Sequence, residues 1–273
     1  MNVISSLGSE LLKYSEYVRI SFKKMLAYRV SYMIGVITYI IHVAVYYFLY
    51  QSLYHKHDSI NGYTLQEMLT YISLGWISKS LYLNYIDREI TEDIQSGQVA
   101  MDLIKPIDFQ LMYFARGIGH SLFRFVLFTP PIVVFTFILF STSGPASGFH
   151  LAAFSVASFF SILIYLAINY IIGLLAIFFL SLRGILYSKN LIIELLSGLL
   201  LPIDWFPNWF QFLSGLLPFQ AIAYYPLQIY LGRIHGQFIF FSLLSQLTWL
   251  AIIFLVGRFV WIVCQRRILI QGG

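Results

Sequence analysis

Long apolar runs of Phe, Ile, Leu, Val and Tyr recur between Val30 and Val263, with only short polar gaps between them. An α-helix rises about 1.5 Å per residue, so roughly 20 apolar residues cross a hydrocarbon core about 30 Å thick. Hydrophobic residues make up 59% of the chain and charged residues 11%, whereas soluble domains carry about 25% charged residues. The sequence therefore predicts an all-α polytopic membrane protein.

Six segments fit membrane-spanning helices, and no polar gap is long enough for a separate soluble domain. The expected spans are residues 30–50, 63–86, 118–140, 151–180, 185–201 and 238–264. The fifth is short, and Glu194 and Gly198 interrupt it. We therefore expect a transmembrane domain over residues 30–264, followed by a tail at residues 265–273.

Residues 1–29 lack the apolar stretch of a cleavable signal sequence and have the pattern of an amphipathic helix. Apolar residues at spacings of three and four share one face of this helix: Leu11, Tyr14, Val18, Phe22 and Met25. That face is expected to lie in the headgroup layer, with the basic face in water. A solvated helix that touches no lipid is the alternative.

Lys and Arg are distributed unevenly between the two sides of the six-span arrangement. If the amino terminus is inside, the inner segments hold twelve Lys and Arg residues. Five of them precede the first span, three lie in residues 87–116, two lie near the start of the fifth span and two lie in the tail. Outer segments hold only Lys56 and Arg233. Because basic residues stay on the cytoplasmic side, both termini are expected in the cytoplasm.

The segment 202–234 mixes prolines with aromatic residues, which is typical of the membrane interface, where helices end. We expect a re-entrant outer hairpin of one or two half-inserted helices, whose non-helical backbone is shielded by protein or lines an aqueous cavity. The residues that indicate it are Pro202, Trp205, Phe206, Pro207, Trp209, Pro218 and Phe219. A simple outer loop is the alternative.

The inner segment 87–116 is the most charged part of the chain and contains the sequence DREITEDIQSGQVAMDLIKPIDF. Its acidic residues lie in a short predicted helix that Gly97 ends, since glycine takes the left-handed cap conformation at little cost. A short charged helix held between two spans would provide a contact for a cytoplasmic partner. A solvated loop is the alternative.

Two charged residues fall inside predicted spans, Lys79 in the second and Glu194 in the fifth. Charges are costly in hydrocarbon, so both should face the bundle interior, water or each other. Three interpretations stay open here: an ion pair, a place on the transport path, or Lys79 reaching the inner interface. Asn84 and Asn169 are expected to form hydrogen bonds between helices, and Arg124 to reach lipid phosphate at the inner interface.

At two places the chain resembles the permeases of ABC-2-type exporters. Residues 96–108, serine-glycine followed by apolar and acidic residues and then LIKPID, resemble the inner signature of that family. Residues 197–232 are similar to its second signature, which has a span broken by proline, a Phe-Pro-x-Trp turn and a later Leu-Pro-Phe. The branch that the chain looks most like is the bacterial drug- or viologen-type exporters.

The resemblance implies a half-transporter that pairs with a second copy or a homologous permease, on two copies of a separate ATPase subunit. ATP and Mg would bind to that partner, because this chain has no G-x-x-x-x-G-K-[ST] phosphate loop, and no cofactor is expected on it. Residues 1–29 correspond to the family's connecting helix, and the protein would lie in the bacterial cytoplasmic membrane. The family's coupling helix, which contacts the ATPase, is assigned to these residues and their surroundings: Arg88, Glu89, Glu92, Asp93, Gly97, Leu103 and Pro106.

Other function classes fit less well. A stand-alone ion-coupled carrier or lipid scramblase would show an inverted repeat and several buried acids, and an intramembrane enzyme would need a nucleophile with a base inside the spans. His55 and His57 have no further ligands at zinc spacing, so no metal site is predicted. The net charge of +5 comes from basic residues beside spans, which favours contact with membrane lipids over nucleic acid.

Overall fold

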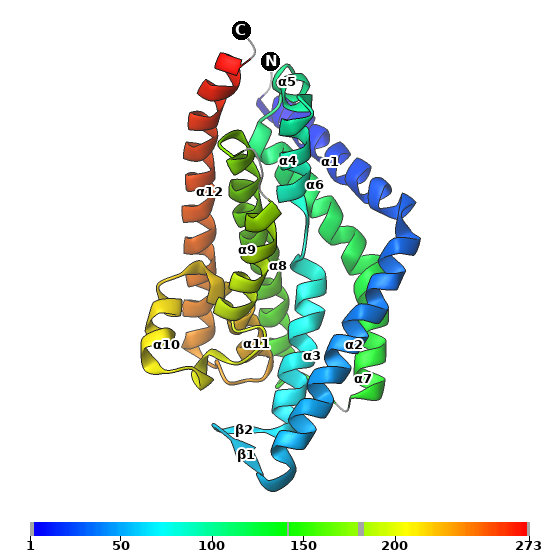
Figure 1. Ribbon diagram of the computed structural model, residues 1–273, viewed down its shortest axis with the longest axis vertical. Coiled ribbons are helices and arrows are strands. Elements are labelled where there is room, and N and C mark those ends of the chain that lie inside the picture. The colour runs from blue at the N-terminus through cyan, green and yellow to red at the C-terminus, as the bar shows by residue number, and fades with distance from the viewer. Residues whose placement is uncertain (1–2, 141, 180–182, 272–273) are drawn as a thin grey trace.

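The computed structural model describes residues 3–140, 142–179 and 183–271, and most of this part is helical (Figure 1). Within it, four helices are long and apolar enough to cross a membrane: Arg29–Lys56, Phe109–Leu139, Gly148–Ile177 and Gln237–Arg267. Both termini lie at one end of the bundle, and a small hairpin of β1 (Ser59–Ile60) and β2 (Tyr63–Thr64) lies at the other (Figure 1). The all-α polytopic membrane fold is confirmed.

The helices follow one another with short connections. In chain order they are α1 (Val3–Ala27), α2 (Arg29–Leu53), α3 (Leu65–Tyr82), α4 (Ile86–Gln95), α5 (Gln98–Leu103), α6 (Phe109–Phe123), α7 (Thr129–Leu139), α8 (Gly148–Leu174), α9 (Arg183–Leu196), α10 (Asn208–Gly215), α11 (Tyr224–Tyr230) and α12 (Gln237–Gln271). One turn of π-helix, Arg124–Phe128, joins α6 to α7.

The second and fifth predicted spans are shorter helices than the other four. Helix α3 has 18 residues and α9 has 14, which gives lengths of about 27 Å and about 21 Å. Helix α3 ends at Tyr82, and α4 continues toward the end with the termini after a non-helical segment, residues 83–85 (Figure 1). The continuous span predicted for residues 63–86 is therefore wrong at its inner end.

Asparagine side chains supply the hydrogen bonds that the helix loses at residues 83–85. Asn84 Nδ2 donates to the Tyr82 carbonyl, and the Ile86 amide donates to Asn84 Oδ1. From α8, Asn169 Nδ2 donates to both Asn84 oxygens, at 3.1 and 2.9 Å. Buried non-helical backbone needs such partners. The prediction that Asn84 and Asn169 form hydrogen bonds between helices is confirmed in part, because Asn169 of α8 bonds to Asn84, which lies between α3 and α4.

Helix α4 packs tightly along the inner end of α8. A Cβ atom on Gly173 of α8 would lie 2.8 Å from Ile90 Cβ and 3.1 Å from Asp87 Cα. Ile86 and Ile90 are fully buried, in a cluster that also contains residues of α6, α8 and α12. The absence of a side chain at residue 173 thus allows α4 to join the bundle.

Helix α1 crosses α6 at a second close approach, at Gly119. A Cβ there would come within 2.5 Å of the Val18 carbonyl oxygen and 2.8 Å of Ser21 Cβ. Met25 and Ser21 are buried on the same side of α1, while Leu11 is 70% exposed. The predicted apolar face therefore packs on the protein near its carboxyl end.

The segment after α9 forms two short helices, α10 and α11, joined by turns (Figure 1). Asp204 fixes this segment, because it accepts hydrogen bonds from Tyr63 at 2.8 Å and from Tyr224 at 2.5 Å. Tyr71 of α3 donates to the carbonyl of Gly198, which has φ of +76° and lies two residues after the end of α9. These contacts join the segment to α3 and to the β1–β2 hairpin.

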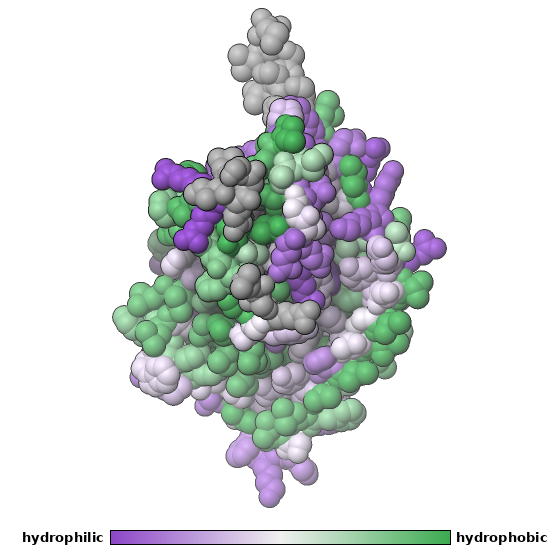
Figure 2. Space-filling model, turned by 45° about the horizontal axis from the view of Figure 1, so that its top comes forward, coloured by the Kyte–Doolittle hydropathy of each residue, from purple (hydrophilic) through white to green (hydrophobic). Residues whose placement is uncertain are grey.

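Hydrophobic residues cover the flanks of the molecule, and hydrophilic residues gather toward the end with the termini and at the opposite tip (Figure 2). Long apolar side chains of α2 and α12 point outward, among them Ile34, Phe48 and Phe259 at 63%, 66% and 68% exposure. Such a band is what a bilayer requires of a protein surface.

Candidate functional site

The structure brings together the two charged residues that the sequence places inside spans. Lys79 Nζ, on the last turn of α3, lies 2.5 Å from Glu194 Oε1 on α9. The ammonium also lies 4.4 Å from the centre of the Trp76 ring, close enough for a cation–π contact. The two side chains are 14% and 20% exposed, so the ion pair reaches the surface of the single chain.

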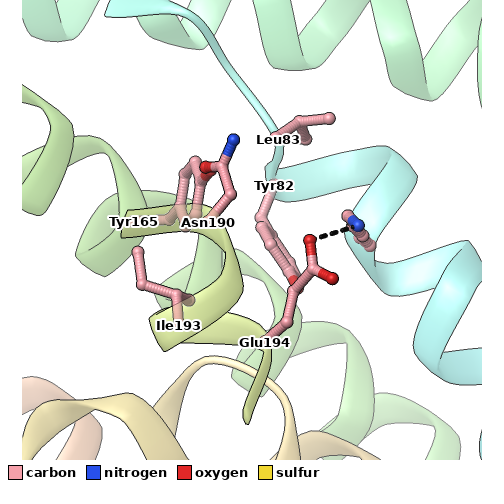
Figure 3. A pocket seen from close by; sticks show the side chains of 7 residues that line it. Tyr82, Leu83, Tyr165, Asn190, Ile193 and Glu194 are labelled. Atoms are coloured by element: carbon pink, nitrogen blue, oxygen red, sulfur yellow. Dashed lines mark hydrogen bonds and ion pairs between the residues drawn. The ribbon is translucent and has the colours of Figure 1, made fainter. Parts of the chain in front are cut away.

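A small pocket opens beside this ion pair (Figure 3). Its volume is about 10 Å³, close to the space that one water molecule needs. Tyr165 of α8 donates a hydrogen bond to Asn190 Oδ1 of α9 across the pocket, at 3.2 Å. Tyr82 and Ile193 complete the wall, so α3, α8 and α9 all contribute to one polar site.

A second ion pair lies deeper in the protein and joins α4 to α9. Lys189 donates to Asp87, and the two side chains are 7% and 1% exposed. Lys189 also donates to Asn169 Oδ1, so the cation bridges α4 and α8. We call Lys79, Glu194, Asp87, Lys189 and Asn169 the polar centre.

From the sequence alone, Lys189 is only a basic residue near the inner end of a predicted span, and Asp87 is only part of the charged segment. One signal was available: Lys189 falls inside the fifth predicted span, residues 185–201, as Glu194 does. Residues 189 and 194 are five apart, so the 14-residue helix carries two charges beyond its first residue, and each of these two must find a partner.

Arg124 lies elsewhere than predicted. Its side chain is 2% exposed and reaches no lipid surface, because α2, α3 and the π-helical turn enclose it. Nη1 donates weakly to the Ser80 carbonyl at 3.4 Å, and the guanidinium lies 4.8 Å from the Phe128 ring centre. Among the described residues no carboxylate forms an ion pair with it, so it is a buried cation held by a carbonyl and aromatic rings.

Charged side chains form a network at the end that carries the termini, centred on Arg116 of α6. Its guanidinium lies 2.9 Å from Asp93 Oδ2, 3.4 Å from Asp102 Oδ2 and 3.8 Å from Glu89 Oε1. Lys24 of α1 contacts the same Glu89 oxygen at 3.0 Å. This inner network ties α1, α4, α5 and α6 into one unit.

Two further hydrogen bonds support the inner network. Tyr113 donates to Asp93 at 2.6 Å, and Lys105 donates to Asp102 at 2.6 Å. The hydrogen bond to Asp102 raises the pKa of the Lys105 ammonium above its ordinary value. The Asp102 side chain is fully buried, and it is compensated by two cations, as a buried carboxylate requires.

The residues predicted to contact an ATPase therefore fall into two groups. Glu89 and Asp93 point into the inner network, and Arg88 packs over the Tyr85 ring, at 4.9 Å from its centre. The exposed members are Glu92, Gly97, Leu103 and Pro106. Gly97 has φ of +77° and ends α4, as predicted from the sequence.

Exposed apolar side chains gather beside these residues, on α5 and the turn after it. Ile104 is 77% exposed, Met101 is 59% and Leu103 is 36%. This segment, residues 98–106, projects at the end of the molecule where both termini lie (Figure 1). We call it the inner tip.

The residues predicted to form the outer hairpin lie on the α9–α11 segment, at different depths. Pro202 is buried, and Trp205 packs between Tyr50 and Tyr63, with ring centres about 6 Å away. Phe206 stacks on Phe210. Partly buried are Pro218 and Phe219, while Pro207 and Trp209 are exposed.

No group of three or more His, Cys, Asp or Glu side chains is arranged to hold a metal ion within the part of the chain that the structure describes.

Residues 40–272 match a family model described as ABC-2 family transporter protein. The match begins within α2 and extends to the end of α12, so it includes the polar centre and the inner tip. No individual curated protein matches the chain.

Proposed function

The chain belongs to the ABC-2 family of transporter proteins, and we propose that it is the permease subunit of an ATP-binding cassette exporter. It is a multi-pass membrane protein and a transport subunit, and its family associates with an ABC ATPase. In the proposed complex, two ATPase subunits bind ATP and Mg and drive a dimer of permeases. The protein lies in the bacterial cytoplasmic membrane with both termini inside.

The inner tip is the observation that supports coupling to an ATPase. Ile104 and Met101 are more than half exposed at an end of the molecule rich in charge. Exposed apolar clusters at a water-facing surface mark interaction sites. A groove of apolar and polar side chains on the ATPase would cover this cluster and contact Glu92, Leu103 and Pro106 at the same time.

The inner network supports a route by which force leaves the inner tip. Arg116 and Glu89 tie α5 and α4 to α1 and α6, and α4 packs on α8 at Gly173. A displacement of the inner tip would therefore move these helices together. The ion pairs of Asp87 with Lys189 and of Lys79 with Glu194 extend the connection to α9.

The exposed face of α9 supports a dimer. Leu191 and Tyr187 point outward at 65% and 71% exposure, next to the partly exposed ion pair of Lys79 and Glu194. A charge pair facing lipid at this depth is costly. We therefore assign this face of α3 and α9 to the second permease and to the aqueous path between the two copies.

Co-purification tests the coupling role. We expect Ile104→Glu to reduce the amount of ATPase subunit recovered with the permease by about tenfold, because one buried charge in an apolar contact costs more than 1.4 kcal/mol. Ile104→Val is the matched control and should retain the ATPase. Equal recovery with Ile104→Glu, or transport by the permease without any ATPase, would overturn the proposal.

Cysteine cross-linking tests the dimer face in a Cys264→Ser background. Leu191→Cys should give a covalent dimer with a short thiol cross-linker in membranes. Phe259→Cys is the matched control, because it is 68% exposed and lies on a different helix, α12. Cross-linking at residue 259 and none at residue 191 would assign the dimer to another face.

A further inference from the structure

A larger pocket lies away from the polar centre, between α11 and the start of α12. Its volume is about 300 Å³, at the lower end of the range for ligand sites. One cation, three aromatic rings, two serine hydroxyls and one aliphatic side chain line it: Arg233, Tyr225, Phe238, Phe241, Ser242, Ser245 and Ile234. None of these residues belongs to the predicted coupling surface or to the polar centre.

The pocket follows α12 from the headgroup region into the hydrocarbon. Arg233 lies in the turn before α12, which starts at Gln237, and Ser245 is eight residues further, or about 12 Å along the helix. Phe238 and Phe241 are 58% and 55% exposed between these two levels. The site is therefore polar at its outer end and apolar along its length.

Arg233 is held in place by the hairpin on its other side. Its Nη2 donates to the Gly62 carbonyl and lies 3.4 Å from Glu67 Oε2, and its guanidinium stacks on Tyr63 at 3.5 Å from the ring centre. The described hydrogen bonds do not use Nη1. A fixed guanidinium with a free edge is preorganised to bind phosphate oxygen.

We propose that this pocket binds a phospholipid, with its phosphate at Arg233 and one acyl chain along Phe238 and Phe241. The combination of one fixed cation with an apolar groove matches an amphipathic phosphate ester and neither a neutral lipid nor free phosphate. The site lies at the end of the bundle away from the termini, the proposed outer leaflet.

Native mass spectrometry of the purified full chain tests this site with three probes: short-chain phosphatidylglycerol, diacylglycerol of the same chain length, and inorganic phosphate. We expect the phosphatidylglycerol to stay bound and the other two to bind at least about tenfold more weakly, because diacylglycerol lacks the phosphate that Arg233 would bind and inorganic phosphate lacks the acyl chain. Equal binding of diacylglycerol would overturn the phosphate site, and equal binding of inorganic phosphate would overturn the acyl groove.

Two variants locate the bound lipid. Arg233→Gln should weaken phosphatidylglycerol binding about tenfold. Since it also removes the contact with Gly62, Ser245→Phe provides a second test, which fills the pocket and leaves the Arg233 contacts intact. Lys56→Gln is the matched control, because it removes the other outer cation outside the pocket. Wild-type lipid binding by Ser245→Phe, or a disulfide between two Ser245→Cys chains, would overturn the proposal.

Discussion

Lys189 on α9 donates a hydrogen bond to Asp87 on α4 across 102 positions of sequence, and both side chains are buried. Helix α9 is the shortest of the predicted spans, and this contact fixes its inner half against α4 and α8. The ion pair is therefore a major constraint on where α9 lies, and its removal gives the first prediction.

Lys189→Leu should lower the thermal unfolding midpoint strongly, because it leaves the Asp87 carboxylate buried without its cation. Loss of one partner of a buried ion pair costs about 3–5 kcal/mol. The double variant Asp87→Leu with Lys189→Leu should recover most of this loss, since it leaves no uncompensated charge. The unfolding midpoints of the single and the double variant are measured by heating each protein and then recording fluorescence-detected size-exclusion chromatography. A double variant as unstable as the single one would contradict the prediction.

Exchanging the charges of Lys79 and Glu194 should separate an ion-pair role from a role for either charge alone. Lys79→Glu and Glu194→Lys should each reduce ATP-dependent activity of the assembled complex, because each places two like charges in contact. The combined exchange should restore a large part of the activity. The measurement is ATP hydrolysis by the complex in lipid nanodiscs, and failure of the combined variant to recover would exclude the ion pair as the main role.

Glu92 and Asp93 are neighbours in sequence with different surroundings, which allows a matched test of the inner segment. Asp93→Lys should lower stability, because it places a cation against Arg116 in the inner network. Glu92→Lys is exposed and should leave stability within about 0.5 kcal/mol while weakening attachment of the ATPase. Thermal unfolding and co-purification report on the two effects. If Glu92→Lys and Asp93→Lys changed stability and ATPase recovery to the same extent, the assignment of different roles to these two residues would be wrong.

Gly119→Ala should detach α1 from α6, because its Cβ would overlap the Val18 carbonyl oxygen. Overpacking of this kind costs about 1–3 kcal/mol, and the loosened helix should become sensitive to a protease added on the cytoplasmic side. Gly148→Ala is the control, since a Cβ at that position meets no atom within 4 Å. Protection of α1 in Gly119→Ala equal to that in Gly148→Ala would contradict the close approach.

The apolar periodicity was sufficient to predict the membrane class and the four long helices, because burial in lipid is decided by composition over about 20 residues. It could not predict where α3 ends. Residues 83–86 are apolar enough to continue a span, and the break depends on Asn169, which lies 85 positions away in the sequence. Contacts of that kind are not encoded in a local pattern.

Part of the candidate site could also be predicted from the local sequence pattern. Lys79 and Glu194 stood out as charges within apolar runs, and the structure places them in contact. The prediction for Arg124 was wrong. Its position in the sequence indicates how deep it lies in the membrane but not which way its side chain points, and the π-helical turn directs that side chain toward α2 and α3. The contacts of the inner network could not be predicted either, since its acids come from α4 and α5 and its cations from α1, α6 and the turn after α5.

The non-helical residues 83–85 separate α3 from α4, and among the described hydrogen bonds no helical one crosses them. A rotation of α3 against α4 at this joint would leave the backbone hydrogen bonds within each helix intact. A tilt of about 10° at this joint moves the far end of a rod about 27 Å long by about 5 Å. A small rotation at residues 83–85 would thus become a displacement of the β1–β2 hairpin, which lies at the far end of α3 (Figure 1).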